Sequence, residues 1–474
     1  MLFGFESCDN KKHKDTSETT KRHGAITLSS DNEQLVQGFI WAKEQVLSYV
    51  FEGDPVGKWF EAALPGREAF CMRDASHQAN GALVLGLDNH LKNMMHKFCL
   101  HISESKDWCS YWEINRYDMP APVDYSDDEN FWYNLPANFD VIDACYRIFQ
   151  WTGDTSYISN PDFVNFYQKS LNEYITAWDA DNDGLMESPE ANGNRGLATY
   201  WEAGGQRAET GADLVAAQYA ANIAYARMLL IRDEAIEATK YFNIADRLFK
   251  LFNYNWWYKE EGRFYASQLK NEVFDTSNIK AMQIYSLYFD IVDNHRKPSL
   301  FLNLQEGVNI EENSYMADVF YKNGLTEKGF EHLLKQLDPK LRRREYPENS
   351  YTAIGTIVNH VVGLKSYATE NAILTRSGLP SSTKWVHIKN IPVQGRELDI
   401  LQVGQTETEI LITKGEPMLW YPRFTGEFEY LLVNGKRRAV QKKYDNRGNP
   451  ESQLTIKLTK GQTYRVQVPR MTKD

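Results

Sequence analysis

The chain has 474 residues, enough for one large domain with a small one or for three of ordinary size. Hydrophobic residues make up 42% of it and charged residues 25%, as in an ordinary soluble protein. The formal net charge of -11 argues against a polyanion such as nucleic acid as the main partner. No stretch approaches about 18 consecutive apolar residues, so we expect no membrane-spanning helix.

The aromatic content is high, with 12 Trp, 27 Tyr and 23 Phe. Such a surplus suits proteins that stack on flat apolar ligand faces, sugars among them, and it also suits large helical cores. The five cysteines are widely spaced and odd in number, which predicts neither a metal site nor a disulfide framework.

Residues 1–30 are polar and are expected to form a disordered tether. Its start, Met1-Leu-Phe-Gly-Phe-Glu-Ser-Cys8, is similar to the end of a bacterial lipoprotein signal, although Glu6 stands where a small residue is usual. One interpretation is a lipid anchor at Cys8 on a periplasmic or outer-membrane protein. The alternative is a misjudged chain start on a cytoplasmic protein.

From residue 31 to about 369 the hydrophobic period is helical almost throughout. Paired helices joined by long loops predict a mainly α domain of helices packed around an axis, with its functional loops gathered at one rim. The expected helical segments are 31–47, 75–102, 136–151, 161–177, 206–231, 233–256, 276–292, 310–323, 326–337 and 349–365.

After about residue 370 the period changes to two, which predicts a C-terminal antiparallel β-sandwich domain over 370–474. Alternating segments such as Leu398–Val403 and Thr463–Val468 indicate its strands, and Asn434-Gly435 is a hairpin turn signal.

The first polar group of the helical region is Arg73-Asp74, followed by His77 near the start of a helix. A guanidinium can donate to one sugar hydroxyl while the adjacent carboxylate accepts from its neighbour, so Arg73 and Asp74 are candidate substrate ligands, with His77 as a third. The alternative is a capping Asp, a surface Arg and a structural His.

The second group is Trp201-Glu202 in a glycine-containing loop, continued by Arg207, Glu209 and Asp213. An indole face lowers the local polarity and raises the pKa of a carboxyl, as a general acid requires. Glu202 is therefore the candidate acid, with Trp201, Arg207 and Glu209 as candidate substrate ligands. On a helix Glu209 and Asp213 would share a face, although a helix cap is the simpler role.

The third group is Arg342-Arg-Arg-Glu345-Tyr-Pro-Glu348, before an apolar helix. A carboxylate at a helix N-terminus beside arginines is expected to have a lowered pKa, as a general base needs. Pro347 fits the first helical turn, so we favour Glu348 over Glu345. A plain helix cap is the alternative.

The segment Asp179-Ala-Asp181-Asn-Asp183-Gly matches the spacing of an EF-hand calcium loop, with Glu190 in the final position. Pro189 and Gly193 do not suit the exiting helix of such a loop, and a simple turn explains the composition. We expect no cofactor, with Ca²⁺ at Asp179, Asp181 and Asp183 as the alternative.

The chain resembles the six-hairpin glycosidases, the (α/α)6-barrel enzymes that include glucoamylases and α-L-rhamnosidases. In glucoamylases an Arg-Asp pair before the second helix holds the sugar, similar to Arg73-Asp74. Their general acid follows a Trp, as Glu202 does, and their base precedes the last barrel helix, where Glu345 and Glu348 stand. Trp420-Tyr-Pro-Arg-Phe resembles the C-terminal domain of rhamnosidases.

The resemblance implies a glycoside hydrolase that removes a terminal sugar from an oligo- or polysaccharide with inversion. Two departures leave the sugar open: Ala203 stands where glucoamylases place a second acid, and the N-terminal sheet domains usual in rhamnosidases are missing. Similar helical toroids also host sugar epimerases and polysaccharide lyases, in which His77 and His360 would matter. A non-catalytic, glycan-binding surface lipoprotein is a further alternative.

Overall fold

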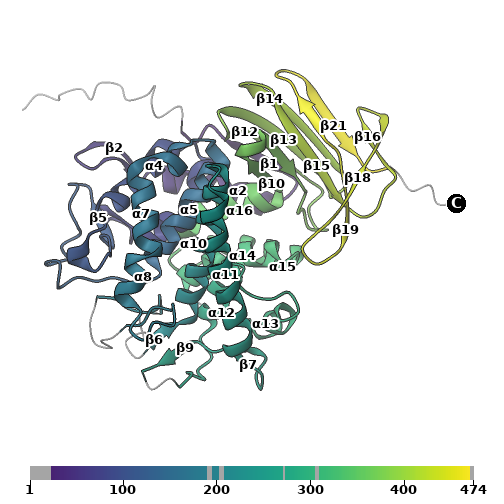
Figure 1. Ribbon diagram of the computed structural model, residues 1–474. Helices are drawn as coiled ribbons and strands as arrows, with labels where there is room; N and C mark the ends of the chain where they lie inside the picture. Colours follow the sequence, from purple (N-terminus) through teal and green to yellow (C-terminus); the bar gives the residue numbers. More distant parts are fainter. Residues whose placement is uncertain (1–22, 189–194, 202–207, 271–272, 305–308, 470–474) are drawn as a thin grey trace, which may run out of the picture.

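The computed structural model describes residues 23–188, 195–201, 208–270, 273–304 and 309–469. A helical region fills one side of the molecule, and a β-rich region formed mainly by the C-terminal part of the chain lies beside it (Figure 1). The first described strand, β1 (Thr27–Ser30), belongs to the β-rich region.

Six helices contact one another in a closed ring at the centre of the helical region. In ring order they are α3 (Met72–Val84), α5 (Ala137–Thr152), α10 (Ala212–Ile231), α12 (Lys280–Tyr288), α14 (Ile310–Lys322) and α16 (Pro347–Thr356), which returns to α3. In α10 and α16 the residues are buried on nearly every face, because neighbours cover these two helices on most sides.

Further helices cover this ring from outside, and they are amphipathic. In α11 (Ala235–Asn255) the buried residues Ala238, Tyr241, Ala245, Leu248 and Phe252 recur every three or four positions and face α10. The other outer helices are α2 (Glu33–Leu47), α4 (Asp88–Leu100), α6 (Ser156–Ser159), α7 (Pro161–Leu171), α8 (Glu173–Trp178), α13 (Lys297–Asn303) and α15 (Thr326–Gln336).

Short strand pairs shape the loops of the helical region. They are β2 (Val50–Asp54) with β3 (Gly57–Phe60), β4 (Ala69–Cys71) with β5 (Glu113–Asn115), β6 (Ala208–Gly211) with β9 (Ser267–Leu269), and β7 (Trp257–Tyr258) with β8 (Arg263–Phe264). Strands β4 and β6 run directly into the inner helices α3 and α10, so their pairing fixes where these two helices begin.

The β-rich region contains two sheets. The seven-stranded sheet has the order β1-β12-β13-β14-β21-β16-β17, and the six-stranded sheet has β10-β11-β15-β19-β18 with β20 beside β15. Their strands are β10 (Leu364–Tyr367), β11 (Ala372–Thr375), β12 (Trp385–Val393), β13 (Arg396–Val403), β14 (Glu407–Lys414), β15 (Met418–Thr425), β16 (Tyr430–Val433), β17 (Lys436–Ala439), β18 (Gln441–Tyr444), β19 (Pro450–Gln453), β20 (Ile456–Leu458) and β21 (Thr463–Gln467).

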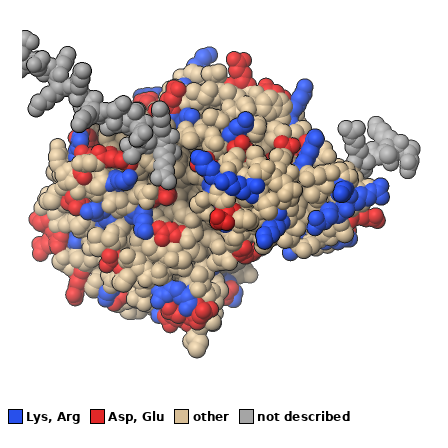
Figure 2. Space-filling view, turned by 90° about the horizontal axis from the view of Figure 1, so that it is seen from above, with Lys and Arg blue, Asp and Glu red and all other residues tan. Residues whose placement is uncertain are grey.

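Asn434 and Gly435 form the predicted two-residue turn between β16 and β17, where Val433 pairs with Lys436. Both turn residues have positive φ, 48° and 79°, which matches the twist of the flanking strands. The exposed residues of β17 and β18 are rich in Lys and Arg, and Figure 2 shows such side chains gathered on the β-rich side.

The two regions share a continuous hydrophobic core. Hydrogen bonds also cross the seam, from Trp151 Nε1 to the Pro392 carbonyl at 2.7 Å and from Gln402 Nε2 to the Val362 carbonyl at 2.6 Å. Strand β10 begins three residues after a short π-helix at Ile357–Val361, so α16 leads directly into the β-rich region.

Several expected boundaries differ from the structure. Thr27–Ser30, expected within the tether, pairs with β12 as β1, because Ile26 and Leu28 are buried and the strand satisfies an open sheet edge. The segment expected as one helix at 75–102 forms α3 and α4, separated at Gly86, which has φ 76°. Residues 1–22, including Cys8, lie outside the described residues.

One helix in the described residues, α10, is long and apolar enough to cross a membrane by length and composition alone. However, 72% of its apolar window is buried inside the protein. Its composition is therefore accounted for by its place in the inner ring.

Candidate active site

Acidic residues stand in the first turns of five inner helices. They are Asp74 in α3, Asp140 in α5, Asp213 in α10, Glu311 and Glu312 in α14, and Glu348 in α16. Helix N-termini favour negative charge, so first-turn acids are ordinary in isolation. Here the ring brings several of them to one end, where they act on each other and on Arg73.

Helices α3 and α16 approach each other very closely. A Cβ placed on Gly81 would lie 2.0 Å from the Tyr351 carbonyl oxygen, and one on Gly355 would lie 3.1 Å from the Gly81 nitrogen. A side chain at Gly81 would therefore collide with the backbone of α16, and one at Gly355 would crowd Gly81. This contact sets the first turns of the two helices, with Asp74 and Glu348, side by side.

Asp74 is held from two directions. The Cys71 thiol donates to its Oδ2 at 2.7 Å, and the Arg73 guanidinium lies 3.3 Å from its Oδ1. Arg73 also lies over the ring of Tyr200, 5.2 Å from its centre. The predicted Arg-Asp pair therefore forms at the start of α3, and it is almost wholly enclosed.

Glu348 is completely buried, and neither carboxyl oxygen receives a hydrogen bond from a described residue. Burial raises its pKa well above the usual range, and the neighbouring Asp74 carboxylate raises it further, against the opposing effect of Arg73. The expectation of a lowered pKa is therefore wrong. Desolvation and a second carboxylate outweigh the arginine and the helix N-terminus.

His77 lies one helical turn beyond Asp74 and faces the same carboxyl. Its Nε2 is 3.7 Å from Glu348 Oε1 and 3.1 Å from the Ser314 hydroxyl of α14. Its ring stacks on Tyr315 with centres 3.4 Å apart. Burial lowers the pKa of His77 well below its ordinary value, so the ring is neutral near pH 7.

The loop carrying Trp201 is fixed by Asp213, the buried first-turn acid of α10. Asp213 Oδ2 accepts from the Tyr200 amide at 2.7 Å and from the Thr199 hydroxyl at 3.1 Å. The Tyr200 hydroxyl donates to Asp140 of α5. Burial raises the pKa of Asp140 to about 8 and of Asp213 to about 6. Tyr200 therefore contacts Asp213 through its amide and Asp140 through its hydroxyl, and its ring lies against the Arg73 guanidinium.

The structure brings together Arg73, Asp74, His77 and Glu348, while Trp201 is half-buried and follows Tyr200 in the fixed loop. Glu202 and Arg207 lie outside the described residues. Glu345 is exposed, unlike Glu348, although the two are only three residues apart.

Glu209 and Asp213 do not share a helix face. Glu209 lies in β6, and its carbonyl accepts from the Ser188 amide, whereas Asp213 is the second residue of α10. The intervening Gly211 is extended, and a Cβ there would lie 2.4 Å from the Ala198 carbonyl oxygen. Because Ala208–Gly211 forms strand β6, α10 begins at Ala212, whereas the sequence predicted a helix from residue 206.

Three members of this cluster, Asp140, Tyr200 and Tyr315, were not predicted from the sequence. Asp140 had a usable signal, because it stands four residues after Pro136 at the start of a predicted helix, and Asp74 and Glu348 likewise stand in first turns. Tyr200 and Tyr315 had none, since buried tyrosines are common in helical cores.

The acidic turn at Asp179, Asp181 and Asp183 forms with Glu187 as a fourth member. One carboxylate oxygen from each lies within 4.8 Å of the others, and burial raises the pKa of Glu187 to about 8. Several of these oxygens also accept backbone amides, as in a turn without metal. Glu190 lies outside the described residues, and calcium here stays a prediction.

Comparison with known proteins identifies the fold through structure alone. Neither a family model nor a curated protein sequence matches this chain. Several solved structures match it in fold. A sialidase covers 82% of the chain at 12% identity with a TM-score of 0.59. An α-L-rhamnosidase from Dictyoglumus thermophilum covers 93% at 13% identity and 0.58, and the GH78 family rhamnosidase of Bacillus sp. GL1 covers 83% at 10% and 0.58.

This chain spans only part of those proteins, 40% of the sialidase, 50% of the Dictyoglumus rhamnosidase and 41% of the Bacillus rhamnosidase. A putative kojibiose phosphorylase from the human microbiome is also similar, at 10% identity and a TM-score of 0.54. These enzymes share one architecture at low sequence identity. The chain therefore has the fold of the six-hairpin glycosidases.

Proposed function

We propose that the chain is an inverting, exo-acting glycoside hydrolase whose closed ring of helices is the inner layer of an (α/α)6 barrel. The observation that carries the proposal is the buried pair of Asp74 and Glu348 beside Arg73 at one end of that ring. Glycoside hydrolysis requires carboxyl groups that hold and release protons next to groups that grip sugar hydroxyls. The similarity to glycosidase structures supports the same class.

In this proposal Glu202 is the general acid that protonates the leaving oxygen. Glu348 takes a proton from water on the opposite face of the sugar in those molecules in which its carboxyl is ionised, and its raised pKa makes this fraction larger as the pH rises. Arg73 and Asp74 hold hydroxyls of the cleaved sugar, and Trp201 forms an apolar surface below it. Inversion requires the two carboxyls to stand about 6.5–9.5 Å apart, to leave room for the water. Bound sugar and water would supply the hydrogen-bond donors that Glu348 lacks among the described residues.

The substrate that we propose is the terminal sugar of an oligo- or polysaccharide, cleaved as in rhamnosidases or glucoamylases. A periplasmic or outer-membrane location, with lipid on Cys8, would place the enzyme where foreign glycans arrive. Both the substrate and the location rest on resemblance.

His77 favours a second candidate, a sugar epimerase or polysaccharide lyase. Burial keeps its imidazole neutral, and a neutral imidazole has one ring nitrogen that is able to accept a proton from a bound sugar. His360 does not join it at this cluster, because its Nε2 bonds Asp318 at 2.6 Å and the residue lines another cavity. An epimerase would release no new reducing end.

A screen of the purified protein against plant, algal and host glycans tests the proposal. We expect wild type and Glu345→Gln to release one monosaccharide, and Glu348→Gln and Glu202→Gln to release almost none. Conversion without new reducing ends would indicate the epimerase or lyase instead. Glycan retention by all four proteins without any reaction would indicate a binding protein.

A further inference from the structure

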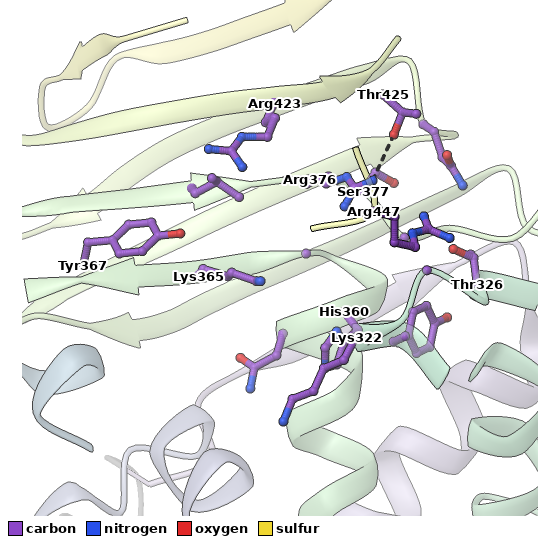
Figure 3. Close-up of a pocket in the computed structure, with 17 residues that line it drawn as sticks. Lys322, Thr326, His360, Lys365, Tyr367, Arg376, Ser377, Arg423, Thr425 and Arg447 are labelled. Carbon is purple, nitrogen blue, oxygen red and sulfur yellow. Dashed lines mark hydrogen bonds between the residues drawn. The ribbon is translucent and has the colours of Figure 1, made fainter. Parts of the chain in front are cut away.

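A second polar cavity lies at the seam between the helical and β-rich regions (Figure 3). It has a volume of about 270 Å³, several times that of one water molecule. It lies at the far end of the ring from Glu348. Lys322, at its edge, ends α14, whereas Glu311 stands in the first turn of that helix about 17 Å away by helical rise.

The lining of this seam cavity is strongly basic. None of its described lining residues is Asp or Glu, whereas the cationic members are Lys322, Lys365, Arg376, Arg423 and Arg447. Figure 3 shows Arg376, Arg423 and Lys365 on the β-rich side of the cavity and Lys322 and His360 on the helical side below it. The two regions of the fold therefore contribute positive charge to one space.

Four of these cations form ion pairs with carboxylates that do not line the cavity. The ion pairs are Lys322 with Asp318 at 3.1 Å, Arg376 and Arg423 with Glu451 at 2.8 and 3.2 Å, and Arg447 with Asp445 at 3.2 Å. In the part of the chain that the structure describes, Lys365 makes neither an ion pair nor a side-chain hydrogen bond. It is the cation for which the fold supplies no paired carboxylate.

The surroundings of Lys365 are unfavourable to its charge, although the side chain is open to solvent in the cavity and so can reach a ligand. Its pKa is lowered first by the loss of hydration among the surrounding atoms and then by Lys322 and Arg376, with only partial compensation from Asp290. Like charges in one cavity repel each other, and a bound anion would reduce that repulsion. Hydroxyls of Thr326 and Thr425 also line the space and can donate hydrogen bonds.

We propose that the seam cavity binds a multiply charged oxyanion, phosphate or sulfate, with Lys365 as its central ligand. The anion is either free or carried by a carbohydrate. Arginine forks and a lysine ammonium match the charge and donor pattern that such groups require. Because Lys322 and Arg423 come from different regions of the fold, the bound anion would also tie these regions together. The inference does not depend on the proposed hydrolysis.

Calorimetry and thermal unfolding of the full chain test this site. At constant ionic strength, phosphate and sulfate should raise the Tm of wild type above its value in chloride, and Lys365→Met should weaken binding at least tenfold. Lys389→Met, at an exposed strand position outside the cavity, is the matched control and should bind as wild type does. Lys365→Gln repeats the test should the Met variant not fold.

Parallel titrations with glucose 6-phosphate and galactose 6-sulfate separate the two sources of anion. Tighter binding of the sugar esters identifies a carbohydrate-borne group, and tighter binding of inorganic ions identifies a free anion. Equal binding of every anion by wild type and Lys365→Met, or no binding at all, overturns the proposal. Without added anion, Lys365→Met should be at least as stable as wild type, because it removes like-charge repulsion.

An independent observation concerns His23, Glu52 and His90, which come from three separate segments. Glu52 Oε1 of β2 lies 3.6 Å from His23 Nε2 and 3.4 Å from His90 Nε2 of α4. These distances are long for charge-assisted hydrogen bonds. They match the separation of about 3.3 Å between two ligand atoms held tetrahedrally at about 2.0–2.1 Å from one metal ion.

The surroundings prepare two of these groups as ligands. His23 Nδ1 donates to the Gly86 carbonyl at 2.9 Å, which leaves the lone pair of Nε2 directed to the cluster. His90 is completely buried, and neither of its ring nitrogens hydrogen-bonds to a described residue. Lys58 Nζ lies 3.2 Å from the same Glu52 oxygen, so a metal would compete with its ammonium.

We infer that His23, Glu52 and His90 bind a divalent transition metal such as zinc. Two imidazoles and a carboxylate suit Zn²⁺, and an adjoining cavity lined by His23 and Lys58 gives water access to a fourth position. The ion would fasten the segment before β1 to the β2–β3 hairpin and α4.

Zinc binding to the chelator-treated full chain is measured by calorimetry and elemental analysis. Wild type and His295→Gln, an exposed control, should bind zinc at this site, and His23→Gln and His90→Gln should each lose that binding. Zinc should also raise the Tm of wild type and of the control alone. Equal zinc uptake and equal Tm shifts in all four proteins would overturn the inference.

Discussion

Asp74 and Glu348 stand side by side on the first turns of two helices, and each helix contributes a glycine to the contact that holds them there. The Asp74 carboxylate raises the pKa of its buried neighbour, so the two groups compete for negative charge. Structural cores rarely retain such an arrangement without compensation. Sites that transfer protons frequently contain such pairs of interacting acids.

The clearest functional prediction concerns Glu348 and its exposed neighbour Glu345. Replacing a general acid or base removes about 10²–10⁴-fold in rate, so Glu348→Gln should lower kcat by that factor. Glu345→Gln should leave kcat within about twofold of wild type, because Glu345 is exposed. Steady-state hydrolysis of the substrate found in the glycan screen measures both. Equal losses in the two variants would contradict the assignment of Glu348.

The pH dependence of hydrolysis distinguishes a base from an acid. Asp74→Asn removes the carboxylate that raises the pKa of Glu348, so that pKa should fall. A general base loses activity when it is protonated, and therefore the acidic limb of the kcat/KM profile should move to lower pH. Displacement of the alkaline limb instead would show that Glu348 is the acid.

Stability should change with pH in a direction set by the same carboxyl. The folded-state pKa of Glu348 lies above its unfolded value of about 4.3, so its contribution to stability is present below about pH 4.3 and is lost as pH rises through the folded pKa. The amide that replaces this carboxyl in Glu348→Gln cannot ionise. The free energy of unfolding of Glu348→Gln should therefore increase relative to wild type as pH rises, in urea titrations at pH 4.5, 7 and 8.5. A difference independent of pH would count against the raised pKa.

The helix contact itself is open to test at Gly81. A Cβ there would lie 2.0 Å from the Tyr351 carbonyl oxygen, so Gly81→Ala should push α3 from α16 and lower the free energy of unfolding by at least about 2 kcal/mol. Gly395→Ala is a suitable comparison, since no atom lies within 4 Å and only its φ of 70° opposes the change. It should cost about 1 kcal/mol. Urea unfolding that ranks the two variants in the opposite order would contradict this view of the contact.

Much of the fold was predictable because its periodicity is strong. The apolar spacing indicated α5, α11, α14 and α15 to within about two residues at each end. The hairpin turn at Asn434-Gly435 followed from turn chemistry alone. The expected boundary that was wrong at β1 depended on a contact distant in sequence. Strand β1 forms because β12 lies beside it, and this pairing spans more than 350 residues, so no local sequence pattern predicts it.

Four of the residues chosen as candidates lie together in the structure, but their electrostatics were not predictable. Arg73, Asp74, His77 and Glu348 were chosen from residue type and position, and the structure gathers them. The sign of the Glu348 pKa shift was wrong, since burial and the approach of Asp74 depend on glycines in the middle of two helices. Asp140 was missed although it repeats the first-turn position of its partners.

The measurement that tests the central claim most directly is hydrolysis followed by proton NMR, with the wild type, Glu348→Gln and Glu345→Gln proteins on the glycan identified in the screen. We predict that the wild type and Glu345→Gln proteins release a sugar whose first-formed anomer is inverted, and that Glu348→Gln releases almost none. Release of a retained anomer, or equal release by all three proteins, would contradict the account.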